Sequence, residues 1–396
     1  MSARDEARSA FARLFIATGL ILLAAGATLP VLPRFVTEEL GGGGVEVGVV
    51  IGAFSLTGLA CRPLAGRFAD LRGRRPAVLG GAIAASVAGV VLLVPAGLGG
   101  LIAARMILGA GEGTLYTAAS AWVVDIAPPA RRGRFVGLFG LAIWGGLSLG
   151  APIGELLRAE LGYTAVWVFA AVTPVLAAAT AATLREPGVA AHGSDGPVAR
   201  GSLIHRGALL PGAGLALASM GFAAVAGFIV LSAEQRGFEV GAVAFTGFAG
   251  AVVAMRLIGG GLPDRVGAVP CAIAAGLGDA AGLAMIALAG SAPVLIAGAV
   301  VMGASFSLIF PSLALLVLGP TPPERRGAAM GTFTACFDLG LGLGGPIAGA
   351  LAQLGGYETS FLVMACGGIG IVAIATGLRG RSHAPYAPPS EELPLP

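Results

Sequence analysis

The strongest indication of the fold is the stretch Arg62-Pro63-Leu64-Ala65-Gly66-Arg67-Phe68-Ala69-Asp70-Leu71-Arg72-Gly73, because a related stretch occurs at 256–267. Its Arg, Gly, Asp and Gly recur at an offset of 194 residues as Arg256, Gly260, Asp264 and Gly267. Three more pairs share the offset: Pro128-Pro129-x-Arg131-Arg132-Gly133 with Pro322-Pro323-x-Arg325-Arg326-Gly327, Pro152-Ile153 with Pro346-Ile347, and Gly162-Tyr163 with Gly356-Tyr357. One offset along the whole chain predicts two halves of similar structure.

The composition is that of a protein embedded in a bilayer. The mean hydropathy is +0.89 and only 11% of residues are charged, against about 25% in soluble domains. A helix needs about 20 apolar residues to cross a bilayer. Twelve segments qualify: 11–33, 45–65, 76–97, 99–124, 133–157, 163–183, 207–233, 239–261, 268–289, 291–318, 327–353 and 356–378. The first could pass for a signal peptide, but its length and the eleven later segments indicate a retained helix.

The predicted fold is an all-α membrane protein with twelve transmembrane helices in two pseudo-symmetric six-helix bundles. The bundles cover residues 1–183 and 207–378, joined by a cytoplasmic linker at 184–206 and followed by a disordered, Pro-rich cytoplasmic tail at 379–396. Two similar halves in a membrane protein are typical of secondary transporters, whose substrate site lies between the halves near the bilayer midplane. We expect a monomer surrounded by lipid.

Arginine sets the predicted orientation, because the chain has no lysine. With both termini in the cytoplasm, all but four arginines fall on the cytoplasmic side, as the positive-inside rule requires. The exceptions are Arg34, Arg105, Arg158 and Arg236. Arginine without lysine, together with abundant Gly and Ala, favours a bacterial origin and hence the bacterial inner membrane. The net charge of +3 reflects this orientation and does not indicate a nucleic-acid partner.

Metal, cofactor and enzyme chemistry are not expected. The four cysteines form no CxxC pair, and the three histidines lie in predicted cytoplasmic segments. The chain has no GxxxxGK[ST] phosphate-binding motif, so a nucleotide is not the predicted energy source. A membrane-embedded enzyme or a sensor is a third class of function, but the sequence has no nucleophile–base pair and no sensing domain to support it.

The segment Gly66-Arg67-Phe68-Ala69-Asp70-Leu71-Arg72-Gly73-Arg74-Arg75 resembles the inner-loop signature of the major facilitator superfamily. The resemblance extends over the whole chain and implies a transporter. Arg105-x-x-x-Gly109-x-Gly111-x-Gly113 looks like the motif of proton-coupled members, and Gly146-x-x-x-Gly150-Ala151-Pro152-Ile153-Gly154 is similar to the antiporter motif of efflux members. In the latter, Ala151 and Glu155 stand where the family has glycines.

The inner-loop signature predicts an inner gate. A carboxylate at Asp70 can pair with neighbouring arginines or meet the positive end of a helix from the other half, and Asp125 is placed to join it. Such a network would lock the halves together on the inner side; alternatively, the charges only satisfy the positive-inside rule. The predicted gate residues are Gly66, Asp70, Arg72, Gly73, Arg74, Arg75 and Asp125.

Residues that the two halves do not share are the predicted candidates for coupling and substrate binding. Arg105 aligns with Ala299, Glu112 with Phe306, and Asp338 with Trp144. Glu112 lies about 20 Å along its span and Asp338 about 17 Å along its own, near the midplane, where ionisable groups are costly and functional by default. We predict that Glu112 and Asp338 carry the proton and that Arg105 tunes the coupling. A buried structural hydrogen bond is the alternative for each acid.

The predicted substrate site is apolar with a few charges. Its predicted residues are Glu112, Tyr116, Trp144, Phe222, Phe306 and Phe310. Apolar packing is the alternative for each aromatic residue. The chain has no asparagine and two glutamines, whereas a sugar carrier needs several amide side chains for the hydroxyl groups. The first hypothesis is therefore a proton-coupled exporter (antiporter) of lipophilic small molecules, with lipophilic cations among them. The second is a proton symporter or facilitator that takes up a small organic anion bound by Arg105.

Overall fold

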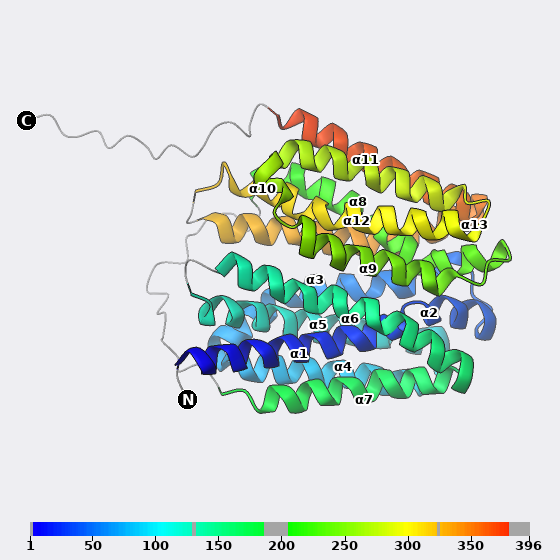
Figure 1. The fold of residues 1–396 in the computed structure, drawn as a ribbon. Coiled ribbons are helices and arrows are strands. Elements are labelled where there is room, and N and C mark those ends of the chain that lie inside the picture. Colours follow the sequence, from blue (N-terminus) through cyan, green and yellow to red (C-terminus); the bar gives the residue numbers. More distant parts are fainter. Residues whose placement is uncertain (1–2, 129–131, 186–204, 323–324, 380–396) are drawn as a thin grey trace, which may run out of the picture.

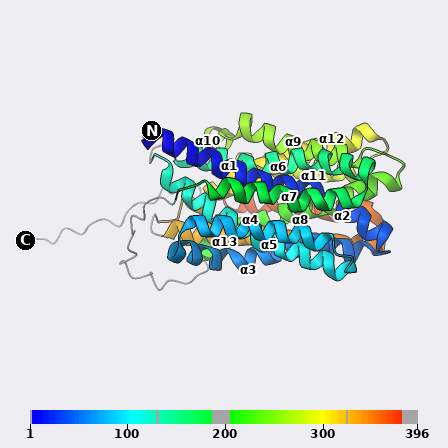
Figure 2. The ribbon, with the colours of Figure 1, turned by 90° about the horizontal axis from the view of Figure 1, so that it is seen from below.

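The computed structural model describes residues 3–128, 132–185, 205–322 and 325–379, and within these ranges its regular secondary structure is entirely helical. Most of the predicted linker and all but the first residue of the predicted tail lie outside the described residues. The long helices run along one common direction in both views (Figures 1 and 2). The chain enters α1 and leaves α13 at the same end of this bundle, which we call the termini side; the opposite end is the distal side (Figure 1).

The first half contains six long helices. They are α1 Ala3–Thr28, α3 Gly44–Arg72, α4 Arg74–Leu92, α5 Gly97–Ile126, α6 Arg132–Leu161 and α7 Tyr163–Ala182. The first predicted span differs from the structure, because α1 ends before Pro30 and the chain continues as the short α2 Val31–Arg34 and the π-helix η1 Phe35–Glu39. Pro30 and Pro33 have no backbone N–H to continue a regular helix, which explains the break.

The second half contains α8 Arg206–Gln235, α9 Gly241–Gly259, the short α10 Leu262–Val266, α11 Ala268–Ala287, α12 Ala292–Leu318 and α13 Arg326–Gly377. α13 is two spans joined at Gly356, whose φ of 79° interrupts the helix. Ten described helices are apolar and long enough to cross a membrane by composition alone. α5 is not among them, since Arg105 and Glu112 lower its hydropathy. With α5, and with α13 counted twice, the prediction of twelve spans is confirmed.

The repeat in the sequence is also a repeat in backbone conformation. Gly73 and Gly267 have φ values of 96° and 103°, and Gly162 and Gly356 both have 79°. These positive values favour glycine, because a Cβ atom would clash with the backbone there. The structure therefore uses the same glycine turn at matching points of both halves, which confirms the predicted pseudo-symmetry.

The two halves meet along two matching pairs of helices. α3 packs on α13, and α6 packs on α9. On the distal side the α3–α13 contact is a seam of glycines: a Cβ atom added at Gly44, Gly48 or Gly52 would overlap backbone of the facing segment 342–349. Small residues let membrane helices approach this closely. The distal side is thus closed by direct backbone packing between the halves.

Candidate transport site

A cavity of about 940 Å³ lies between the two halves. Helices α1, α3, α5 and α6 line it from the first half, and α8, α9, α12 and α13 line it from the second. Its size is within the range of about 300–1,000 Å³ that is typical for small-molecule sites.

The cavity opens toward the termini side. Its lining residues near that side, such as Leu257 and Gly261, are exposed, whereas those toward the distal side, such as Leu29 and Ile51, are buried. The glycine seam closes the distal side of α3 and α13. The structure therefore has one open and one closed end.

Three charged side chains meet on the cavity wall. Arg62 on α3 donates from Nε to Oδ2 of Asp338 on α13 at 2.8 Å, and its Nη2 lies 3.7 Å from Oε2 of Glu112 on α5. Glu112 is 5% exposed and Asp338 is 4% exposed. A single guanidinium thus lies between two nearly buried acids, and its bond to Asp338 ties the first half to the second.

Glycines bring these side chains together. A Cβ atom on Gly113 would lie 3.3 Å from Cα of Gly58 and 3.7 Å from Cγ of Arg62, so α3 and α5 can approach closely only with a small residue there. Gly342 gives the same freedom on α13, where a Cβ atom would lie 2.6 Å from the side chain of Leu56. These contacts set Arg62 beside both acids.

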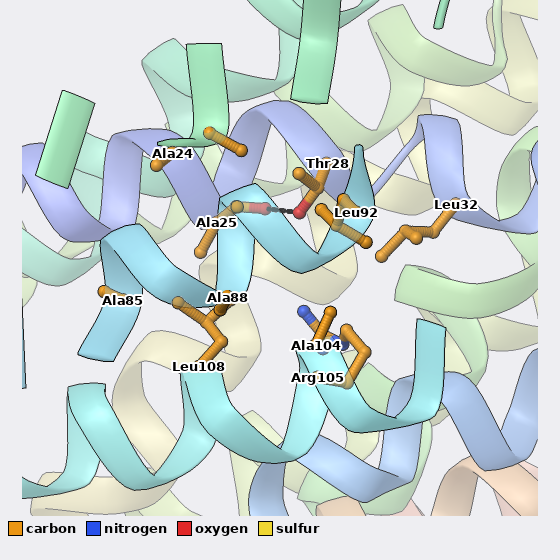
Figure 3. Close-up of a pocket in the computed structure, with 12 residues that line it drawn as sticks. Ala24, Ala25, Thr28, Leu32, Ala85, Ala88, Leu92, Ala104, Arg105 and Leu108 are labelled. Atoms are coloured by element: carbon orange, nitrogen blue, oxygen red, sulfur yellow. Dashed lines mark hydrogen bonds between the residues drawn. The ribbon is translucent and has the colours of Figure 1, made fainter. Parts of the chain in front are cut away.

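Arg105 does not join this cluster. Its Nε donates to the carbonyl of Val50 at 3.1 Å, its Nη2 donates to that of Ile51 at 3.4 Å, and its guanidinium lies 4.9 Å from the ring centre of Phe54. Arg105 also borders a second, internal cavity of about 20 Å³, where Figure 3 shows it across from Thr28. That volume has room for about one water molecule. These contacts lie between α3 and α5, and the tuning of coupling by Arg105 stays a prediction.

The predicted aromatic residues all border the large cavity. The rings of Trp144, Phe222 and Phe306 form a cluster with centroids 5.5 to 5.6 Å apart. Tyr116 stacks on Phe139 at 5.7 Å and lies 5.8 Å from the guanidinium of Arg62. Phe310 packs against Phe333 at 5.3 Å.

Two arginines of the cavity, Arg62 and Arg256, were missed by the search for residues unique to one half. They occupy equivalent positions of the repeat and were therefore assigned to the scaffold. The signal that could have found them is simple: both lie inside predicted spans, and an ionisable residue there is a candidate functional site.

The predicted inner-gate residues lie at the termini side of the first half. Arg74 forms an ion pair with Asp125, and Arg75 donates to the carbonyl of Ala182 at 2.7 Å. Asp70 and Arg72 are exposed near the end of α3, and Gly73 forms the turn into α4. Gly66 faces α5, where an added Cβ would lie 4.0 Å from Thr117. A lock between the halves through these residues stays a prediction.

An ion-pair cluster on the distal side was not predicted. Arg34, next to η1, pairs with Glu155 on α6 at 2.5 Å and with Glu234 on α8. Arg158 also pairs with Glu155 at 2.6 Å. Since Glu234 belongs to the second half, this cluster adds a polar tie to the glycine seam on the closed side.

Comparison with known proteins agrees with this architecture. The sequence profile of the Major Facilitator Superfamily matches residues 14–243 and 212–395. An uncharacterized MFS-type transporter of Burkholderia mallei (strain SAVP1) is 35% identical over 378 residues, which cover 92% of this chain and 90% of that protein. One from Salmonella typhimurium (strain LT2) is 33% identical, with coverage of 93% and 96%.

A solved structure shows the same fold at low sequence identity. The nucleoside transporter NupG superposes with a TM-score of 0.77 at 13% identity, and the match covers 93% of this chain and 100% of that one. The family consists of transporters and not of enzymes. The repeat, the membrane-spanning halves, the cavity between them and these matches together make the chain a multi-pass membrane transporter of the major facilitator superfamily.

Proposed function

We propose that the protein is a proton-coupled exporter of lipophilic small molecules in a bacterial cell membrane, with both termini in the cytoplasm. The observation that carries the proposal is the position of Arg62 between Glu112 and Asp338 on the cavity wall. Because Asp338 is on the second half and Arg62 on the first, the charge state of this acid affects both the cavity and the contact between the halves.

A proton can replace the guanidinium as the partner of either carboxylate. Protonation of Asp338 removes the charge that attracts Arg62, which weakens the tie between α3 and α13 inside the cavity. Loss of that proton restores the attraction. An acid that must be neutralised either by Arg62 or by a proton therefore links proton binding to the relative position of the halves, which is the requirement for coupling.

The opening of the cavity supports loading from the cytoplasm. The positive-inside rule predicts that the termini side faces the cytoplasm, and the cavity opens toward that side. Transport then requires the glycine seam and the Arg34 cluster to separate on the distal side. The Arg74–Asp125 region is the proposed inner gate, which closes when the distal side opens.

The cavity lining supports a lipophilic substrate. Most lining residues are aliphatic or aromatic, and the charged residues among them are three arginines and two acids. The competing hypothesis, uptake of an organic anion bound by Arg105, loses support because the guanidinium of Arg105 already bonds to Val50 and Ile51.

The test is a pH measurement inside proteoliposomes that hold the purified protein. A panel of lipophilic cations, neutral compounds and anions is added with and without an imposed proton gradient, and Glu112→Gln and Asp338→Asn are compared with the wild type. Proton movement opposite to the substrate, lost in at least one of these variants, supports antiport through the cluster. The matched control is Glu239→Gln, which removes an exposed acid outside the cavity. Proton movement in the same direction as the substrate overturns the export proposal.

A further inference from the structure

We propose that Arg256 is an anion-binding subsite of the cavity, and that the transported molecule is an aromatic organic anion whose carboxylate binds this guanidinium. The inference rests on the proposed function, because it takes the central cavity as the transport site. The proposed ligand is an anion and not a cation, and the residue that binds it is Arg256 and not Arg105.

The first argument is the repeat. Arg62 and Arg256 are equivalent residues of the two halves. Arg62 meets Asp338 and Glu112, and at the same offset the residues equivalent to these acids are Trp144 and Phe306. Arg256 therefore has aromatic residues, Trp144 and Phe306, at the positions where Arg62 has its two acids.

The second argument is the charge balance of the cavity. Within the part of the chain that the structure describes, no carboxylate lies within ion-pair distance of Arg256. Arg62 is paired with acids, and Arg105 bonds to two backbone carbonyls. The cavity lining therefore carries one net positive charge, from three arginines and two acids, and Arg256 is its partly exposed arginine without an ion pair among the described residues. Such a charge inside a membrane protein is costly without an opposite charge, which a bound anion would supply.

The third argument is the shape around Arg256. Its Nη1 lies 3.0 Å from where a Cβ atom on Gly140 would be, so the glycine leaves the room that the guanidinium occupies. Trp144 follows Gly140 by about one helical turn, or roughly 6 Å along α6. Both residues line the same cavity. The guanidinium is thus presented close to the cluster of Trp144, Phe222 and Phe306.

This pairing defines the ligand by its chemistry. A planar guanidinium binds a carboxylate through two parallel N–H···O bonds, which gives both strength and orientation. Aromatic side chains bind a ring by edge-to-face and offset contacts. The site therefore fits one aromatic body carrying one anionic group at its end. A neutral or cationic analogue would leave Arg256 unpaired.

The experiment uses three probes of similar shape that differ in charge: 2-naphthoate, 2-naphthamide and 2-naphthylmethylammonium. Their binding to the full-length protein in lipid nanodiscs is measured by isothermal titration calorimetry, with no proton gradient. We expect 2-naphthoate to bind at least about tenfold more tightly than 2-naphthamide, because it gains hydrogen bonds between charged groups. Arg256→Gln should remove this preference and leave binding of the amide unchanged, and Arg256→Lys should restore part of it.

The matched control is Arg265→Gln, which removes an exposed arginine outside the cavity and should keep the preference. Size-exclusion profiles show whether each variant is folded, and Arg256→Lys provides the test if Arg256→Gln is not. The proposal is overturned if 2-naphthoate binds no better than the amide, or if its preference survives in Arg256→Gln. Because binding is measured at equilibrium, loss of proton coupling in the proteoliposome assay would leave this result standing, so the two proposals fail separately.

Discussion

Arg62 and Asp338 join the two halves of the transporter inside its cavity, with Nε of the arginine 2.8 Å from Oδ2 of the aspartate. The contact lies between the closed distal seam and the open termini side. This ion pair joins the two halves, so it is weakened both when the acid is protonated and when the halves separate. It is therefore the contact whose removal is most informative.

Asp338→Asn should uncouple transport from the proton. The amide keeps the size of the side chain and can still accept a hydrogen bond from Arg62, but it cannot bind and release a proton as a carboxylate does. We expect substrate to move down its own gradient at a measurable rate, with substrate-driven pH change abolished. The measurement is the ratio of proton flux to substrate flux in proteoliposomes. An unchanged ratio would assign the proton to Glu112 or to another group.

The ion pair should also show itself in stability. Arg62→Gln leaves two nearly buried acids without their cation, and we expect a loss of roughly 1–3 kcal/mol, below the values for fully buried pairs because Arg62 is partly exposed. The double variant Arg62→Gln/Asp338→Asn should lose less than the sum of the two single variants. Thermal unfolding in detergent, analysed as a double-mutant cycle, measures the difference. If the losses of the two single variants add up to the loss of the double variant, the interaction between Arg62 and Asp338 does not contribute to stability.

Arg105 should behave as a structural residue. Its guanidinium holds two carbonyls of α3 and covers the ring of Phe54, so Arg105→Ala should destabilise the protein by about 1–3 kcal/mol. The coupling ratio of the folded fraction should remain that of the wild type. Thermal unfolding and the proteoliposome assay check the two parts. A stable Arg105→Ala protein that transports without proton coupling would return Arg105 to the role that the family resemblance implies.

The fold could be predicted from sequence because its main signals are strong and repeated. Apolar segments of spanning length mark the helices, and equivalent glycines such as Gly162 and Gly356 mark equivalent turns. The first predicted span lies within one apolar helical stretch, Glu6–Glu39, but the break of the helix at Pro30 was not predicted. The orientation, the domain boundaries and the roles of the site residues remain predictions.

The charge cluster could be predicted only in part. Glu112 and Asp338 were identified because they differ between the halves, but Arg62 and Arg256 were set aside because they are shared. The presence of an arginine in both halves shows only that the two positions are equivalent. The residues around each arginine determine what it can bind. Arg62 faces acids, whereas Arg256 has Trp144 and Phe306 at the matching positions. Contacts between helices far apart in sequence, such as α3 with α13, cannot be derived from one sequence.

The glycine seam should control which side of the protein is open. A Cβ atom on Gly48 would overlap the backbone oxygen of Gly345, so Gly48→Leu should prevent α3 and α13 from closing on the distal side. Overpacking costs about 1–3 kcal/mol, and we therefore expect the population with an open distal side to rise at least about fivefold. The control is Gly80→Leu on the exposed face of α4, where an added Cβ meets nothing within 4 Å.

The readout is a single cysteine, Leu29→Cys, at the buried distal end of the cavity, in a protein whose four native cysteines are replaced by serine or alanine. A membrane-impermeant maleimide added to intact cells labels this cysteine only when the distal side is open to the exterior. Gly48→Leu should accelerate labelling and Gly80→Leu should not, because only the first substitution forces apart backbones that belong to different halves. Equal labelling rates in both variants would mean that close packing of the glycine seam is not what keeps the distal side closed. Rapid labelling without either substitution would mean that the termini side faces the exterior, contrary to the orientation that the arginines predict.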